Sequence, residues 1–157
     1  VILFTRDGET FVLMIKRARH LERHAGEIAF PGGMSDPDDK DLLQTALRET
    51  LEELRLEIAE DSVIGRLTTV TTLSGIKVTP FVAVVADLRG YEINVAEVEL
   101  ALEIPLKELL STRRENPDSK AGGDMFLFQE HDIWGASAKI LNDLAQLGIP
   151  WQLNHPD

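Results

Sequence analysis

The strongest constraint on this chain is an amphipathic helical pattern that runs from about Asp39 to Leu56. At about 100° per residue, the apolar and small residues of this segment fall in one sector of a helix; they are Leu43, Ala46, Leu47, Thr50, Leu51 and Leu54. A separate arc, roughly 100° wide, holds Glu49, Glu52 and Glu53. The pattern predicts a helix that packs on a core through its apolar sector, with Asp36, Asp38 and Asp39 as candidate N-cap residues.

The acidic arc needs a compensating charge. Like charges three or four residues apart on a helix repel, at a cost of about a few tenths of a kcal/mol per pair. A hard divalent cation such as Mg²⁺ takes oxygen ligands and is often held by one or two carboxylates plus substrate phosphates. Glu49 and Glu53, one turn apart, have this spacing, and Arg48 at the edge of the arc can orient a glutamate. On these residues alone, a solvated acidic helix face is the alternative.

Length, composition and charge bound the class of protein. With 157 residues, 43% hydrophobic and 27% charged, the chain is predicted to form one globular domain over residues 1–157. The net charge of −11 excludes a general nucleic-acid-binding surface. The absence of cysteine excludes disulfides, thiolate metal sites and cysteine nucleophiles.

The chain has no apolar run that would span a bilayer, the longest being Phe81 to Ala86. We therefore expect a soluble, cytoplasmic protein without membrane contacts, whose oligomeric state is open and includes a homodimer. Val1 to Phe4 is an apolar run without an initiator Met or a signal-peptide pattern, so we expect the chain to begin inside a longer natural sequence.

Strand and helix patterns alternate along the rest of the chain. The Asp7-Gly8 pair predicts a hairpin between Val1–Phe4 and Phe11–Ile15. Further strands are predicted over residues 63–72, 76–88, 98–104 and 125–129, with a short helix over 105–110 and a polar loop over 116–123. A closing helix over 135–147, ended by Gly148 and Pro150, is predicted to bury Ile140, Leu141, Leu144 and Leu147, and Trp134 is predicted to join the core. The result is a mixed α/β sandwich.

Two motifs resemble one enzyme family. Phe30-Pro31-Gly32-Gly33, followed fifteen positions after Gly33 by Arg48-Glu49-Thr50-Leu51-Glu52-Glu53, resembles the Nudix box of enzymes that hydrolyse nucleoside diphosphates linked to another group. Upstream, the segment from Leu13 to Gly33 is similar to the motif of the coenzyme A pyrophosphatase branch; its matching positions include Arg17, Leu21, His24, Gly26 and Glu27. The resemblance implies a Nudix-fold α/β/α sandwich with a mixed β-sheet.

The resemblance also implies roles for individual residues. Glu49 and Glu53 would be the main ligands of Mg²⁺ or Mn²⁺, and Glu52 a third ligand or an orienting base. Arg48 belongs to the same catalytic group. Glu97 resembles a carboxylate outside the box that takes the proton of water in some members, with a plain surface residue as the alternative.

Substrate-binding roles follow from the same resemblance. Gly32 and Gly33 would place the helix beside the diphosphate. Arg17 and Arg23 would bind phosphate groups, with a solvated basic patch as the alternative, whereas His24 is expected to fix its loop by hydrogen bonds.

The chain departs from the box in two places. Arg55 stands where the box has Gly, so either the turn differs or the helix continues. One extra residue separates Gly33 from Arg48, so the first glutamate of the box corresponds to Asp39 or to Lys40. The expected activity is hydrolysis of the diphosphate of coenzyme A or its derivatives. The alternatives are another substrate (ADP-ribose, a dinucleotide or a nucleoside triphosphate) and a Nudix-like domain that binds without turnover.

Overall fold

The first two strands form the hairpin that the Asp7-Gly8 pair predicts. In the computed structural model, which describes residues 1–86, 88, 90–119 and 122–148, β1 (Ile2–Arg6) pairs antiparallel with β2 (Glu9–Arg17). Asp7 and Gly8 both have positive φ angles, 51° and 77°, as a two-residue turn that matches the strand twist requires.

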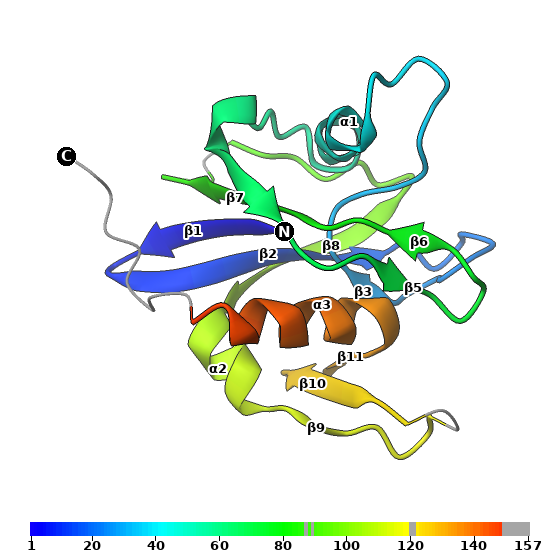
Figure 1. The fold of residues 1–157 in the computed structure, drawn as a ribbon, viewed down its shortest axis with the longest axis vertical. Helices are drawn as coiled ribbons and strands as arrows, with labels where there is room; N and C mark the ends of the chain where they lie inside the picture. The colour runs from blue at the N-terminus through cyan, green and yellow to red at the C-terminus, as the bar shows by residue number, and fades with distance from the viewer. Residues whose placement is uncertain (87, 89, 120–121, 149–157) are drawn as a thin grey trace.

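A mixed six-stranded sheet is built around this hairpin (Figure 1). β1 pairs parallel with β7 (Phe81–Val85), which pairs antiparallel with β4 (Val63–Arg66). The other edge of β2 pairs antiparallel with β8 (Val98–Pro105). β3 (Ile28–Ala29) pairs with Ile15 and Lys16, beyond the point at Leu13 where the pairing with β1 stops.

Helices cover both faces of the sheet. α1 (Leu42–Leu54) lies on one face, and α2 (Leu106–Ser111) and α3 (Gly135–Gln146) lie on the other (Figure 1). Because side chains alternate along a strand, β2 serves two cores: Leu13 and Ile15 pack in the cluster of Leu54, and Val12 and Met14 pack in the cluster of α3. The predicted α/β/α sandwich with a mixed β-sheet is therefore confirmed.

The two long strands predicted over residues 63–72 and 76–88 are each broken. Pro80 has no N–H to donate, and its carbonyl accepts from the N–H of Leu67 at 2.8 Å, while the N–H of Thr68 donates to Asp143 of α3 at 2.7 Å. Short strands result on both sides of the break. They are β4 and β7 in the main sheet and the separate pair β5 (Val70–Thr71) and β6 (Lys77–Val78).

The remaining elements are short. A 3₁₀ turn, η1, spans Glu60–Ser62. β9 (Arg114–Glu115), β10 (Asp124–Phe128) and β11 (His131–Ile133) form a three-stranded sheet. The described residues of the predicted polar loop, 116–119 and 122–123, lie between β9 and β10 and belong to no helix or strand. No helix in the described part of the chain combines the length and the apolar character needed to cross a bilayer.

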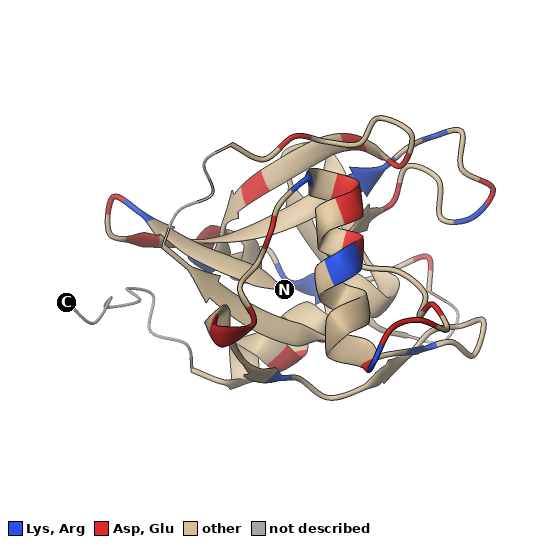
Figure 2. Cartoon of the chain, turned by 90° about the horizontal axis from the view of Figure 1, so that it is seen from above, with Lys and Arg blue, Asp and Glu red and all other residues tan. Residues whose placement is uncertain are grey.

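The N-cap prediction for α1 is wrong. Asp41 caps the helix by accepting from the N–H of Gln44 at 2.9 Å, because Asp39 is engaged elsewhere, with Arg48. The helix is shorter than predicted, ending at Leu54, and Figure 2, which looks onto α1, shows acidic positions along it and on the loops around it.

α1 is also rotated relative to the predicted core face. Leu51, predicted to be in the core, has 49% of its surface exposed, whereas Glu53 is only 1% exposed. The helix is therefore turned about its axis so that Glu53 faces the sheet and Leu51, at the other edge of the apolar sector, faces solvent.

On α3, Ile140, Leu141 and Leu144 are buried as predicted, but Leu147 and Trp134 are exposed. These two residues flank the helix as its C-cap and N-cap, so neither lies on the buried stripe. Pro150 lies outside the described residues.

Candidate active site

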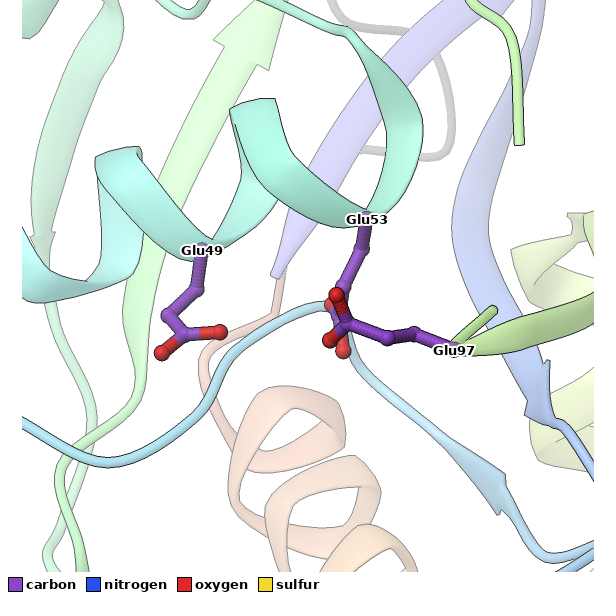
Figure 3. Close-up of side chains that lie close together, drawn as sticks. All are labelled: Glu49, Glu53 and Glu97. Atoms are coloured by element: carbon purple, nitrogen blue, oxygen red, sulfur yellow. The ribbon is translucent and has the colours of Figure 1, made fainter. Parts of the chain in front are cut away.

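Three carboxylates meet beneath α1. Glu49 and Glu53 project from the same side of the helix, and Glu97, the residue before β8, reaches toward them from the sheet (Figure 3). One carboxylate oxygen from each residue lies within 4.8 Å of the others. We call these three residues the acidic cluster.

Glu53 is the buried member of the acidic cluster. Its Oε2 accepts from the backbone N–H of Gly32 at 2.9 Å, and its Oε1 lies 3.9 Å from Nη1 of Arg17. Burial raises the pKa of Glu53 to about 7, against the opposing effects of the Gly32 bond and the Arg17 charge. Glu49 and Glu97 raise it further by repulsion. A positive charge bound in the cluster, in addition to that of Arg17, would therefore favour the ionised form of Glu53.

Glu49 lies against the backbone of Gly33. A Cβ atom at position 33 would stand 2.5 Å from both carboxylate oxygens of Glu49, so only glycine leaves room for this approach. Burial also raises the pKa of Glu49, and the hydrogen bond from Arg48, at 3.0 Å, lowers it. The two glycines thus contact the two carboxylates of α1 directly.

Arg48 is the centre of a network that orients this edge of the helix. Its Nε and Nη2 donate to the two oxygens of Asp39, both at 3.0 Å, and Thr45 donates to Asp39 at 2.8 Å. These bonds hold the pKa of Asp39 well below its usual range, the Arg48 bonds contributing most. Of the two positions left open by the box spacing, Asp39 is the one that contacts Arg48, whereas the backbone N–H of Lys40 donates to Gln44.

Glu52 lies at the rim of the site. Its side chain is 49% exposed and accepts from Nη1 of Arg48 at 3.2 Å, and that same nitrogen donates to Glu49. Glu52 is not in the acidic cluster, where Glu97 stands as the third carboxylate instead.

The predicted phosphate-binding arginines lie in different surroundings. Arg17, on β2, adjoins Glu53, and its Nε is buried without a hydrogen-bond partner among the described residues. Arg23 is exposed in the segment between β2 and β3. Arg19, for which no role was predicted, is bound by Glu99 at 3.1 Å. In the same segment, Nδ1 of His24 lies 3.0 Å from Oε2 of Glu27, in keeping with a loop-fixing role.

Sequence reasoning missed Asn94, whose Nδ2 donates to Oε1 of Glu97 at 3.0 Å. The only signal was its place three residues before Glu97, because Asn commonly caps a turn through its own side chain.

Comparison with known proteins identifies the family. The sequence pattern of the NUDIX domain matches residues 1–123. The chain belongs to the Nudix family. An uncharacterized Nudix hydrolase, NudL, of Yersinia enterocolitica is 40% identical over 144 residues, covering 88% of this chain and 74% of NudL. NudL of Yersinia pestis is equally similar, with 72% of its length covered.

Solved Nudix structures share the fold at low sequence identity. A MutT/nudix family protein from Enterococcus faecalis matches with a TM-score of 0.71 at 14% identity, over 94% of this chain and 60% of that one. RenU, a Nudix hydrolase of M. smegmatis, matches with a TM-score of 0.64 at 19% identity, over 99% of this chain and 86% of RenU. The NUDIX domain of Shewanella oneidensis NrtR, complexed with ADP ribose, also matches with 0.64 at 19%, over 94% and 83%.

Nudix hydrolases are pyrophosphohydrolases that generally need divalent metal ions, and the family assignment supports this activity for the chain. The acidic cluster fits such an ion by its chemistry. It offers three carboxylates, one of them buried, within 4.8 Å of one another, which is the oxygen donor set that hard divalent cations take.

Proposed function

We propose that this chain hydrolyses the diphosphate bond of coenzyme A or its derivatives, as a single domain that uses Mg²⁺ or Mn²⁺. The products would be 4′-phosphopantetheine, or its acyl form, and adenosine 3′,5′-bisphosphate. The observation that carries the proposal is the contact of Arg17 with Glu53, at 3.9 Å. It joins the segment that resembles the coenzyme A branch to the carboxylates of the Nudix box.

In this proposal the acidic cluster holds the cation. Glu49, Glu53 and Glu97 converge, and their mutual repulsion and the burial of Glu53 favour a bound positive charge. When bound, a divalent cation neutralises phosphate charge and lowers the pKa of a coordinated water. Glu52 would act from the rim, where Arg48 bridges it to Glu49.

Arg17 would bind the diphosphate. Its buried Nε lacks a partner in the described part of the chain, and a guanidinium forms charge-assisted, often bidentate, hydrogen bonds with phosphate. In the reaction, a water oxygen bonds to one phosphorus while the bridging P–O bond breaks. Glu97 would accept the proton of that water, since it is partly exposed and is the one carboxylate of the cluster that approaches α1 from the sheet.

Arg23 would bind the 3′-phosphate that distinguishes coenzyme A from its dephospho form. It is exposed in the segment that connects Arg17 to Gly32 and Gly33. In a chain of net charge −11, a solvent-facing cation in this segment would attract a second phosphate group.

The test is a substrate panel with Mg²⁺ or Mn²⁺ and products identified by mass. It compares coenzyme A, dephospho-coenzyme A, ADP-ribose, a dinucleoside polyphosphate and a nucleoside triphosphate. We expect the highest kcat/KM for coenzyme A or an acyl derivative, with the two products named above. A higher value for ADP-ribose would overturn the substrate assignment, and binding of a nucleotide without turnover of any would favour the non-catalytic alternative.

A further inference from the structure

Asn94 connects two members of the acidic cluster that come from different elements. Its backbone N–H donates to the carbonyl of Glu53, at the end of α1, at 2.8 Å. Its side-chain Nδ2 donates to Oε1 of Glu97 at 3.0 Å, and its Oδ1 accepts from the N–H of Ala96 at 3.2 Å. The backbone of Asn94 is therefore tied to the helix, and its amide is tied to the carboxylate that approaches the helix.

The backbone of Glu97 is held by bonds that do not involve the side-chain amide of Asn94. Its N–H donates to the Asn94 carbonyl and its carbonyl accepts from the N–H of Ala18, both at 2.9 Å. His20 adds a contact from Nε2 to the carbonyl of Ala96 at 2.9 Å. What remains to be set is the direction of the Glu97 side chain, a long and rotatable group.

Electrostatics alone would turn this side chain away. Glu97 is partly exposed, and Glu49 and Glu53 repel its carboxylate toward solvent. A hydrogen bond from an N–H to an ionised carboxylate is stronger than one between neutral groups. The amide of Asn94 supplies such a bond to one oxygen of Glu97.

We propose that Asn94 is a positioning residue that holds the carboxylate of Glu97 in the acidic cluster and thereby sets the affinity for the divalent cation. The inference rests on the proposed function only in taking the acidic cluster as a cation site. It does not depend on which nucleotide is hydrolysed.

The test measures Mn²⁺ binding by electron paramagnetic resonance for wild type, Asn94→Ser, Glu97→Ala and the double variant. Serine keeps a side-chain oxygen that can cap the turn through Ala96, but it is too short to reach Glu97. We expect Asn94→Ser to weaken Mn²⁺ binding about tenfold, as is typical for partners of metal ligands. Because Asn94 acts through Glu97, the double variant should bind Mn²⁺ little more weakly than Glu97→Ala alone.

Asn116→Ser is the matched control. Asn116 caps a turn in the same way, accepting from the N–H of Asp118 at 3.0 Å. It follows β9, on the opposite side of the sheet from α1 (Figure 1). This variant should leave Mn²⁺ affinity unchanged. In turnover, Asn94→Ser should lower kcat at saturating metal by more than it raises KM, because the altered carboxylate acts on water.

Three results would overturn the inference or its basis. Wild-type Mn²⁺ affinity in Asn94→Ser would exclude a role through Glu97. The same conclusion would follow if the fold-loss of affinity in the double variant equalled the product of the fold-losses in the two single variants. Unchanged affinity in Glu97→Ala would instead remove Glu97 from the proposed ligand set. If the serine variant melts well below wild type, Asn94→Thr, which also retains a capping hydroxyl, provides the same comparison. Failure of coenzyme A as a substrate would alter none of these binding results.

Discussion

The buried carboxylate of Glu53 accepts a hydrogen bond from the backbone N–H of Gly32 at 2.9 Å. This bond joins the Phe-Pro-Gly-Gly loop to α1, so loop and helix present their polar groups to the same point. Yet one backbone bond and an arginine at 3.9 Å do not offset burial, since the pKa of Glu53 is raised to about 7. A carboxylate in this condition destabilises the fold when ionised and gains most from a bound cation.

Glu53→Gln should lower turnover by orders of magnitude. The substitution removes the charge of a proposed cation ligand while nearly keeping its shape, and the cation both neutralises phosphate and activates water. Turnover and Mn²⁺ affinity are measured together. Glu57→Gln, the same change at an exposed position after α1, is the control and should behave as wild type. Near-normal hydrolysis by Glu53→Gln would contradict the assignment.

The difference in unfolding free energy between wild type and Glu53→Gln should depend on pH when a chelator removes metal ions. The pKa of Glu53 rises from 4.5 to about 7 on folding, so its contribution to stability is present below pH 4.5 and is lost as the pH rises toward 7. Glutamine does not ionise, so the Glu53→Gln variant has no such loss of stability at this position. Urea unfolding should therefore show a stability advantage for the variant that grows over this range to about 2–3 kcal/mol. A pH-independent difference would mean that Glu53 is not desolvated.

Gly33→Ala should displace the carboxylate of Glu49, because the added Cβ would stand 2.5 Å from both of its oxygens. We expect Mn²⁺ affinity and kcat/KM to fall about tenfold or more. Gly65→Ala on β4 is the control, since a Cβ there meets nothing within 4 Å. If both alanine variants retain wild-type Mn²⁺ affinity, the close approach of Gly33 does not position Glu49.

Arg55→Gly should stabilise the protein by about 1 kcal/mol. Arg55 follows α1 in the left-handed conformation, with φ 49° and ψ 28°, and its N–H donates to the carbonyl of Leu51. An L side chain in this region costs about 1 kcal/mol, which glycine avoids. Arg55→Ala keeps the Cβ and should not show the gain in thermal unfolding. Activity should stay within a few-fold in both variants, and a large rise in Arg55→Gly would indicate an impaired natural enzyme.

The two arginines should affect substrates differently. Arg23→Ala should reduce the preference for coenzyme A over dephospho-coenzyme A by about tenfold to a hundredfold, the value of one charge-assisted phosphate contact. Arg17→Ala should lower kcat/KM for coenzyme A, dephospho-coenzyme A and ADP-ribose alike, because Arg17 adjoins the acidic cluster rather than an outlying phosphate. Persistence of the preference in both variants would show that another group binds the 3′-phosphate.

Local features of this chain were predictable because they depend on neighbouring residues. The Asp7-Gly8 turn follows from the conformations these two residues tolerate, and α1 follows from the spacing of its apolar residues. The breaks near Pro80 were not predicted, because they arise where Thr68 meets Asp143 of the last helix.

For the site, helical spacing alone was enough to predict three candidate cation ligands, since Glu49, Glu52 and Glu53 share one arc of a helix. Which of the three converge with another carboxylate depends on how the helix packs. Packing on the sheet rotates α1 so that Glu53 is buried and Glu52 remains at the rim, and the return of the chain before β8 adds Glu97. Helical periodicity specifies angles about one axis, whereas burial and convergence depend on where a distant segment lies against that axis.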